Sequence, residues 1–531
     1  MNGMAGTGEL VRLILRRDRI RIPVWMAGVA VFLLGSVAGF PAAYGTAAER
    51  QARAALMDNP ATVVLTGPGF GREDYTYGAM TANEMGGMTA VLIALMSILL
   101  VMRHSRHEEE SGRTELLRSA VVGRYAPPAA ALITVLGVNL VLGLVLGFGL
   151  PATLPELSLS GSLLFAAGLT SVGFVFTAVA AVAAQIMEHG RAASGLAGAL
   201  LAVTFALRGA GDLGDGTLSW LSPIGWAQRT RAYVDGIWWP LVPALLLTLV
   251  LVVLAFTLRG RRDEGAGLVR GGLGRASASG RLSGPFALAL RLQRGALTGW
   301  TVGFVLFGAF VGTIAEQAAR FVESNETAQR FFAQNGQADS AETMIATYIS
   351  LMAMVAGGFA LQSAGLSRAE ESAGRLEPLL GGTPLSRTRW AVANLAATVS
   401  GSVLVLGGGG LGAGLVYAAT SGDASNVLRV LAAALVHLPA VWVLAGIATL
   451  LFGLVPAASG LGWLVLAWGV FVGMFGPLLR LPDWLADVSP FAHTPMLPTG
   501  DPEATPLIAL TAAAVVLMAA GVTAFRRRDT A

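Results

Sequence analysis

The chain contains no cysteine and no lysine among its 531 residues. The missing cysteine excludes disulfides, thiol nucleophiles and thiolate metal sites. The missing lysine excludes a Walker A loop, because that loop places a lysine on the nucleotide phosphates. If ATP powers this protein, a different chain must therefore bind it.

Charge is also scarce in this sequence. Only 13% of the residues are charged, whereas a soluble globular protein carries about 25%. The mean hydropathy is +0.65, and apolar runs of about 20 residues recur, each long enough to cross a bilayer as a helix. Because lipid offers the backbone no hydrogen-bond partners, such runs must be helical. The composition therefore predicts an all-α integral membrane protein.

Twelve such runs are present, six in each half of the chain. We expect the first six spans at about 23–43, 84–102, 127–150, 162–187, 191–209 and 239–258. We expect the other six at about 298–317, 345–366, 389–417, 427–453, 457–478 and 506–525.

Arginines set the expected orientation. Several precede the first span, and the segments 103–126, 259–285 and 367–388 are arginine-rich too. The positive-inside rule places these segments, and with them both termini, in the cytoplasm. We therefore expect a multi-pass protein of the cytoplasmic (inner) membrane. The net charge of +4 reflects these membrane-end arginines and not a nucleic-acid surface, because interleaved aromatic residues are lacking.

The two halves carry the same landmarks in the same order. The landmarks are Arg16, Arg19, Trp25, Gly28 and Phe32 with Arg291, Arg294, Trp300, Gly303 and Phe307; Ser222-Pro223 with Ser489-Pro490; and Arg261-Arg262-Asp263 with Arg527-Arg528-Asp529. This duplication predicts two parallel six-helix repeats, 1–258 and 286–531, with a translocation path between them. Residues 259–285, rich in Gly, Ser and Arg, are expected to form a flexible cytoplasmic linker.

A charged segment between the second and third spans is the most specific repeat. The first motif, residues 108–117, and the second motif, residues 370–380, share the pattern E-E-x-x-G-R-x-E followed by paired leucines. The i,i+4 spacing predicts helical ion pairs between Glu109 and Arg113 and between Glu371 and Arg375. An ordinary solvated helix on the inner leaflet is the alternative, although it would need only polarity and not this shared pattern.

The motif resembles the coupling helix of ABC-2 type transporter permeases. Two fused six-helix halves without an ATPase domain resemble the polyketide-antibiotic (tetronasin-type) exporters of actinobacteria. The resemblance implies two copies of a separate ABC ATPase that bind ATP and magnesium, with no cofactor or metal on this chain. It also implies that the motifs contact that ATPase, through Glu108, Glu109, Gly112, Arg113, Glu115, Glu370, Glu371, Gly374, Arg375 and Glu377. The second motif departs from the first by inserting Pro378, so the two contacts need not be equivalent.

The resemblance further implies short amphipathic helices on the inner membrane surface before each half, at 8–21 and 285–297. A plain positive-inside flank would explain these residues equally well. It also implies short re-entrant helices in the outer loops 210–238 and 479–505. There, interfacial tryptophan anchoring is an equal explanation.

A few polar residues fall within the expected spans. Glu84 and Arg208 sit near outer ends, where we expect snorkelling. His437 lies deeper, and we expect it to bond a backbone carbonyl in preference to carrying protons. The glycine run 407–410, with Gly412 and Gly414, predicts close helix packing; local unwinding is the alternative.

The function expected from the sequence is therefore that of the membrane subunit of an ATP-driven exporter of hydrophobic or amphipathic compounds. A proton-coupled secondary transporter is the alternative, and it should carry central carboxylates. A membrane scaffold or sensor is a third possibility, but it should carry an additional soluble domain, and none is visible.

Overall fold

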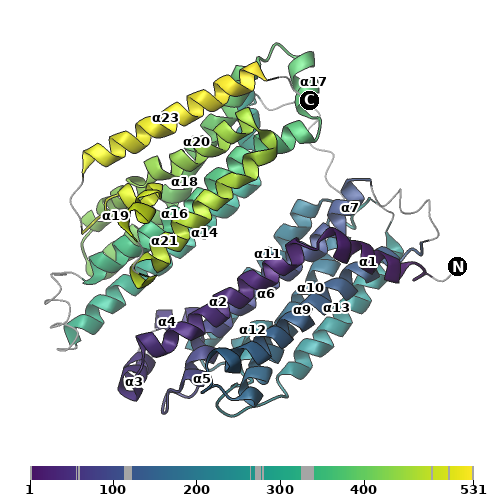
Figure 1. Cartoon of the computed structure of the whole chain (residues 1–531), viewed down its shortest axis with the longest axis vertical. Helices are drawn as coiled ribbons and strands as arrows, with labels where there is room; N and C mark the ends of the chain where they lie inside the picture. Colours follow the sequence, from purple (N-terminus) through teal and green to yellow (C-terminus); the bar gives the residue numbers. More distant parts are fainter. Residues whose placement is uncertain are drawn as a thin grey trace. The chain divides into compact units, whose positions relative to one another are not determined.

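The computed structural model of this chain is built from helices (Figure 1). It describes residues 3–55, 57, 60–112, 122–262, 265–269, 277, 280, 282–324, 340–479, 482–499 and 503–528. Within these ranges the only β pairing is one isolated bridge between Met187 and Val269. Among the described residues, twelve helical stretches are long and apolar enough to span a membrane. These findings confirm the predicted all-α integral membrane fold with twelve spans.

The chain divides into two compact units, Met1–Gly274 and Arg275–Ala531. The boundary falls inside the segment that was expected to link the halves. Residues 259–261 belong to the last helix of the first unit. The backbone N–H groups of Leu268 and Val269 donate to the carbonyls of Gln185 and Ile186. The start of the expected linker is therefore packed against the first unit.

The first unit contains six spans and several short helices. The spans are α2 (Arg21–Ala43), α6 (Gly86–Arg103), α9 (Ala126–Thr153), α10 (Leu159–Ile186), α11 (Gly190–Leu213) and α13 (Leu241–Arg261). The short elements are α1 (Thr7–Arg17), α3 (Ala47–Ala55), α4 (Pro60–Thr66), α5 (Tyr77–Met80), the π-turn Thr81–Met85, α7 (Arg106–Glu110), the 3₁₀ turn Leu218–Leu221 and α12 (Pro223–Gln228).

The second unit repeats this plan. Its spans are α14 (Pro285–Ser324), α16 (Ser340–Ser372), α18 (Arg387–Ser421), α19 (Ser425–Leu435) joined to α20 (Leu438–Leu454), α21 (Gly462–Leu479) and α23 (Ala504–Arg527). The short elements are α17 (Leu376–Gly382), the 3₁₀ turn Pro456–Leu461, α22 (Asp483–Asp487) and the 3₁₀ turn Pro490–His493.

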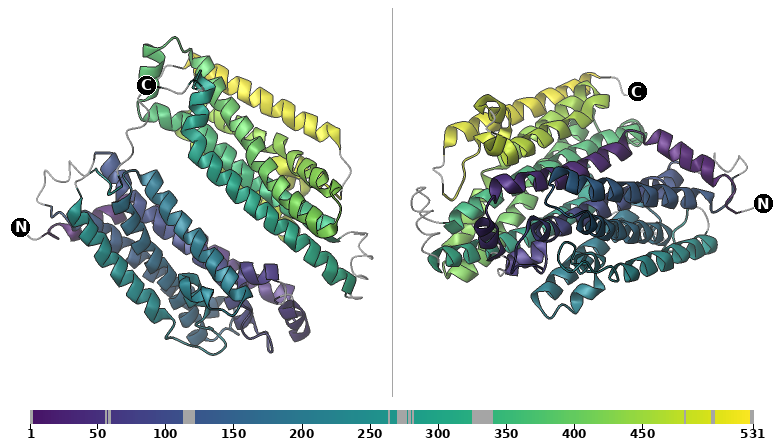
Figure 2. Two further views of the ribbon diagram at one scale, coloured as in Figure 1. Left: turned by 180° about the vertical axis from the view of Figure 1, so that it is seen from behind. Right: turned by 60° about the horizontal axis from the view of Figure 1, so that its bottom comes forward.

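The same spans are central in both units. In the second, third and fourth spans of each unit, 56–72% of the most apolar window is buried within the protein. In the first, fifth and sixth spans, that share is only 17–22%. The peripheral helices α13 and α23 run along the edge of their bundles (Figure 2) and expose leucines and valines. Such apolar faces are stable in contact with lipid chains, because they carry no polar group that would lack a hydrogen-bond partner there.

The N-terminal helices of the two halves differ. In the first unit, α1 ends at Arg17 and α2 begins at Arg21, so the predicted separate amphipathic helix exists. In the second unit, residues 285–297 form the first turns of the 40-residue helix α14. The prediction of a separate helix there is wrong. The first copy is interrupted by Asp18, whose side chain bonds Arg103 instead of facing solvent, and no such residue interrupts the second copy.

Several polar side chains inside the bundles bond one another. Asn139 on α9 donates to Ser97 on α6 at 3.0 Å. In the second unit, Ser363 on α16 bonds Gln293 at 2.5 Å and Thr398 at 2.7 Å. These bonds join the central helices where lipid and water cannot satisfy polar groups. His437 bonds the carbonyl oxygen of Ala433 at 3.0 Å, as predicted.

The glycine run packs α18 closely against α14. Helix α18 continues through the run without a break. A Cβ atom at Gly308 would lie 2.0 Å from the carbonyl oxygen of Gly409, and one at Gly412 would lie 2.3 Å from that of Val305. Only glycine permits this approach of the two backbones. The prediction of close packing is confirmed.

The outer loops between the fifth and sixth spans hold short helical elements in both units; that they are re-entrant stays a prediction. The repeated Ser-Pro pair begins one of them in each half, at Pro223 and Pro490. Arg208, expected to snorkel, is completely buried. Its guanidinium donates to the carbonyls of Val63 and Val64 and pairs with Asp212. The expectation of snorkelling was wrong because the long first outer loop covers this side chain.

Candidate functional site

A tight turn at a glycine shapes each motif. Helix α7 ends at Glu110, and Gly112 follows with φ of +70°. Helix α16 ends at Ser372, and Gly374 has φ of +66°. Glycine adopts this left-handed conformation without steric cost, which explains its presence at the same place in both motifs. The i,i+4 pair predicted between Glu109 and Arg113 requires a helix that continues past Gly112, but α7 ends at Glu110.

Glu109 lies at the centre of a buried cluster of arginines. Its carboxylate oxygens accept hydrogen bonds from Arg106 at 2.9 Å, from Arg259 at 2.7 Å and from Arg262 at 2.8 Å. These three arginine side chains are only 1–3% exposed, and that of Glu109 is 12% exposed. Arg113, its expected partner, lies outside the described residues, as does Glu115.

Arg106 connects this cluster to the backbone of other segments. Its guanidinium donates to the carbonyl oxygens of Ala184 at 2.6 Å and of Ala266 at 2.8 Å. Ala184 belongs to the end of α10, and Ala266 belongs to the segment after α13. One arginine therefore holds together three segments that are far apart in the sequence.

The second motif makes a simpler set of contacts. Arg528 donates to both carboxylate oxygens of Glu371, at 2.5 and 2.6 Å. Arg375 instead pairs with Glu370 at 2.8 Å. The predicted Glu371–Arg375 pair is wrong because the turn at Gly374 takes Arg375 off the helix face of α16. Hydrogen bonding to Glu370 raises the pKa of the exposed Arg375 above its usual value.

One ion pair is common to both halves. Glu109 pairs with Arg262, and Glu371 pairs with Arg528. The glutamates are equivalent in the two motifs, and the arginines are equivalent in the repeated Arg-Arg-Asp sequence. Each pair therefore ties the motif to the end of the sixth span, and we call it the motif–span tie. The repeat identified both members, but spacing along one helix could not show that they meet.

Of the described motif glutamates, Glu108 contacts α1 and Glu377 lies on the surface. Glu108 accepts a hydrogen bond from Arg17 at 2.5 Å. Glu377, in the first turn of α17, is exposed beside the buried Leu376. Pro378 occupies the same first turn, where a missing N–H costs no helical hydrogen bond. The proline therefore fits the helix that follows the second motif.

Asp18 fixes α1 next to the first motif. Its carboxylate accepts hydrogen bonds from Arg103 at 2.9 and 3.0 Å and lies 2.9 Å from the ring of His104. Burial alone would raise the pKa of Asp18, but the hydrogen bonds from Arg103 and the nearby positive charges outweigh it and lower that pKa. Asp18 therefore stays ionised at neutral pH.

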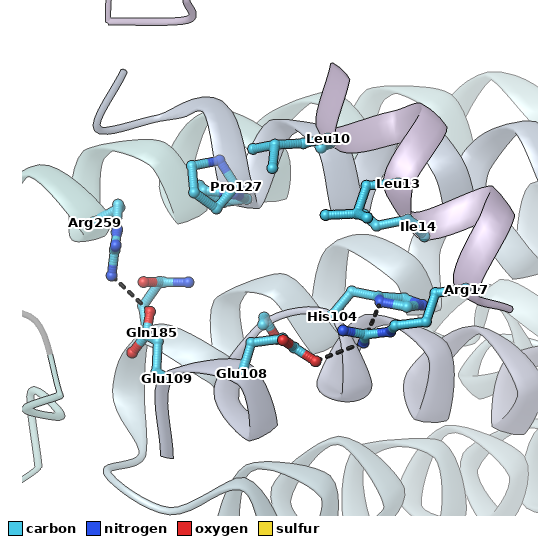
Figure 3. A pocket seen from close by; sticks show the side chains of 13 residues that line it. Leu10, Leu13, Ile14, Arg17, His104, Glu108, Glu109, Pro127, Gln185 and Arg259 are labelled. Carbon is cyan, nitrogen blue, oxygen red and sulfur yellow. Dashed lines mark hydrogen bonds and ion pairs between the residues drawn. The ribbon is translucent and has the colours of Figure 1, made fainter. Parts of the chain in front are cut away.

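A cavity lies between α1, α7 and α9 in the first unit (Figure 3). It encloses about 670 Å³ of space, part of it open to solvent. Figure 3 shows Leu10, Leu13 and Ile14 along one side and Glu108 and Glu109 with their arginines along the other. In the part of the chain that the structure describes, no group of three or more His, Asp or Glu side chains is arranged to hold a metal ion.

Comparison with known proteins gives two matches. The family described as "Multidrug efflux system permease Rv1217c, C-terminal domain" matches residues 282–526. The chain is also 40% identical over 532 residues to the multidrug efflux system permease protein Rv1217c of Mycobacterium tuberculosis, covering 99% of this chain and 96% of that protein. The twelve apolar helices are long enough to place such a permease in a membrane. The chain belongs to the family of multidrug efflux system permeases.

Proposed function

We propose that this chain is the membrane subunit of an ABC-2 type exporter and that two copies of a separate ATPase drive it. The observation that supports this proposal most directly is the motif–span tie, which occurs in both halves. A segment that only covered the inner leaflet would not need the same glycine turn and the same ion pair twice. ATP and magnesium would bind to the ATPase and not to this chain.

The tie suggests how ATPase closure is transmitted. Glu377 is exposed next to the turn, where a partner can reach it. Glu371, six residues earlier, is held by Arg528 at the end of α23. If the ATPase moves the exposed motif residues, the sixth span would therefore move with them, as would the two spans that flank the motif. ATP would shift the population between two arrangements of the spans, because its binding favours one of them.

The substrate class that we propose is inferred from the relative and from the composition of the chain. The relative is named for multidrug efflux, and we propose that this chain likewise exports hydrophobic or amphipathic compounds across the cytoplasmic membrane. Both termini would lie in the cytoplasm, on the side of the arginine-rich segments.

The distribution of carboxylates disfavours a proton-coupled transporter. In the twelve stretches that are apolar enough to span a membrane, acids occur only at Glu84, Glu108–Glu110, Asp212, Glu342 and Glu370–Glu371. The apolar stretch of α14 is Pro285–Thr313, and Glu316 and Glu323 follow it in the last turns of that helix. All of them lie within the first or last few turns of their span. Glu84 is paired with Arg53 at 3.0 Å, and Glu342 with Arg429 at 2.7 Å. A carrier that couples to protons needs an acid near the membrane centre.

Co-purification tests the proposal. The tagged chain would be expressed with an untagged ATPase encoded beside it, as wild type, as Glu377→Arg and as Glu503→Arg. Glu377 is exposed at the motif end of the second unit, and Glu503 is exposed at the opposite end of α23. We expect Glu377→Arg to lose the ATPase and Glu503→Arg to keep it.

Drug uptake into inverted vesicles completes the test. ATP should drive uptake in the presence of a protonophore. If no ATPase associates with the wild-type chain and a proton gradient alone drives uptake, the ATP-driven proposal is wrong and the proton-coupled alternative replaces it.

A further inference from the structure

Another cavity of the first unit lies at the end opposite the first motif, and we call it the α12 cavity. Helix α6 lines it with its first turns, at Gly86 and Ala90, whereas the last residue of α6 precedes the first motif. Figure 1 draws α12 at the end of the unit away from α7. The cavity encloses about 450 Å³ of space, part of it open to solvent, and Phe70, Phe165 and Ile224 form its apolar wall. Ligand sites in proteins combine such a wall with a few polar groups that orient the ligand.

Gln228, the last residue of α12, lines this cavity and has an unused hydrogen-bond acceptor. Its Nε2 atom donates to the carbonyl oxygen of Thr66 at 2.8 Å, and this bond fixes the orientation of the amide. Its Oε1 atom is buried and accepts no hydrogen bond in the part of the chain that the structure describes. A buried acceptor without a donor is costly. A ligand that brings an O–H or N–H group to Oε1 would remove that cost.

Two other polar side chains of the described lining are already used within the protein. The amide of Asn83 donates to the carbonyl oxygen of Phe70 at 2.8 Å and accepts from the N–H of the same residue at 3.2 Å. The hydroxyl of Thr230 donates to the carbonyl oxygen of Ala227 at 2.6 Å. These bonds hold the wall of the cavity in place and leave Gln228 as the residue that can orient a ligand.

The charge of the lining favours a neutral ligand. Arg231 is the one ionisable side chain among the described lining residues. Its guanidinium pairs with Asp235 at 2.7 Å and lies over the ring of Phe70. Because Arg231 would repel a cation, a neutral O–H or N–H group suits Gln228 better than an ammonium group does.

The segment 230–234 is fixed beside the cavity. Tyr233 has φ of +65°, a conformation that a non-glycine residue keeps only where its surroundings enforce it. Its hydroxyl donates to Ser162 at 2.9 Å. It also packs on Gly78 and Gly161, where a Cβ atom would lie 2.7 and 2.4 Å from it. The wall that this segment forms is therefore present before a ligand arrives.

We propose that the α12 cavity binds a neutral, apolar ring compound, with its rings against Phe70 and Phe165 and its O–H or N–H group on the Oε1 atom of Gln228. That such a compound belongs to the exported class rests on the function proposed above. A site opposite the first motif would hold it on the far side of the membrane, on its way out.

Binding of a matched pair of probes tests the proposal. Carbazole carries one N–H group on a neutral aromatic ring system, and N-methylcarbazole carries the same rings without it. Their dissociation constants would be measured by equilibrium dialysis with the purified full-length chain in detergent, without ATPase or nucleotide. Each probe is compared between variants, so its partition into detergent cancels.

Two substitutions of Gln228 isolate its acceptor. Gln228→Met removes the Oε1 atom, whereas Gln228→Glu keeps an acceptor oxygen, and neither keeps the amide N–H that Thr66 accepts. We expect Gln228→Met to weaken carbazole binding about fivefold, the effect of one lost hydrogen bond, and Gln228→Glu to weaken it less. N-methylcarbazole should bind wild type and both variants alike.

A second pair of variants leaves every polar group in place. Ala82→Leu fills the cavity, whereas Ala30→Leu adds the same bulk to α2, away from it. Both alanines are half-buried, and the denaturation midpoint without a probe shows whether each variant is folded. We expect Ala82→Leu to lose both probes and Ala30→Leu to keep them.

Two binding results would overturn the site. They are an equal effect of Gln228→Met on the two probes, and equal binding of the probes by Ala82→Leu and Ala30→Leu. In inverted vesicles, carbazole should also compete with ATP-driven drug uptake; binding without competition would show that the bound compound is not of the exported class. The binding assay contains no ATPase, so a failure of the ATPase to associate would leave its result unchanged, and the two proposals fail separately.

Discussion

The two halves surround the same ion pair with different neighbours. In the first half, Glu109 faces three buried arginines, and Arg106 adds bonds to two backbone carbonyls. In the second half, Glu371 faces Arg528, whose guanidinium lies over the rings of Phe452 and Phe525. In the register of the repeated Arg-Arg-Asp sequence, Phe525 stands where the first half has Arg259.

The comparison distinguishes the features of the motif that both halves share from those that differ between the halves. The glycine turn and the Glu–Arg tie are present in both halves. The surrounding space is filled by charge in one half and by aromatic rings in the other, where Phe525 stacks on Phe452 at 5.2 Å. Both solutions keep the motif attached to the sixth span. They should differ in how much stability depends on the glutamate.

Removing the glutamate charge should show the largest difference between the halves. Glu109→Gln removes the carboxylate that three buried arginines share, and breaking a buried ion pair in this way costs about 3 kcal/mol. Glu371→Gln leaves one arginine that still has its aromatic neighbours, so the cost should be about 1 kcal/mol. The measurement is the thermal denaturation midpoint of the purified chain, read by tryptophan fluorescence at one heating rate. Equal shifts of the denaturation midpoint for the two variants would show that stability depends on the two glutamates to the same extent, which contradicts this prediction.

In the second half, exchanging the two charges of the motif–span tie should restore stability. Glu371→Arg and Arg528→Glu should each destabilise the chain, and the double variant should recover about 1–2 kcal/mol as the coupling energy of the pair. The readout is the same denaturation midpoint in a double-mutant cycle. A cycle with no coupling would show that the contact contributes nothing to stability.

The same exchange in the first half should not restore stability. In the Glu109→Arg, Arg262→Glu double variant, the new arginine still lies beside Arg106 and Arg259, and its repulsion from them is not relieved. We expect little or no recovery relative to Glu109→Arg alone. Recovery equal to that in the second half would mean that the other two arginines do not interact with position 109.

Replacing the turn glycine should destabilise the chain equally in the two halves. Gly112→Ala and Gly374→Ala each force an L residue to a φ near +70°, which costs about 1 kcal/mol, and neither meets an atom within 4 Å of the new Cβ. Gly137 and Gly365 are matched controls, because they lie inside helices and their Cβ positions are also open. Replacing either control by alanine should leave the denaturation midpoint unchanged or slightly raised. A loss at only one of the two turns would contradict their equivalence.

The repeat made much of this molecule predictable from the sequence. Apolar run length gave the twelve spans, since a helix is the only way for such a run to satisfy its backbone in lipid. The motif glycines and the Arg-Arg-Asp repeats were visible, and the second arginine of each repeat pairs with a motif glutamate. The pairing of Glu371 was predicted incorrectly, because i,i+4 spacing assumes a helix that Gly374 ends. Arg208 was misplaced for a related reason, since its partners come from an outer loop far away in the sequence.

The exposed pair in the second motif should matter least for stability and is therefore the cleanest test of coupling. Arg375 is 53% exposed and pairs with Glu370, and such pairs contribute about 0.5 kcal/mol or less. Arg375→Ala should leave the denaturation midpoint almost unchanged. If the motif contacts an ATPase, the same variant should still lower drug-stimulated ATP hydrolysis by the reconstituted complex, because an exposed cation at the turn is then part of the partner interface. Unchanged hydrolysis together with unchanged stability would place Arg375 outside that interface and leave Glu377 as its best-exposed candidate in the second half.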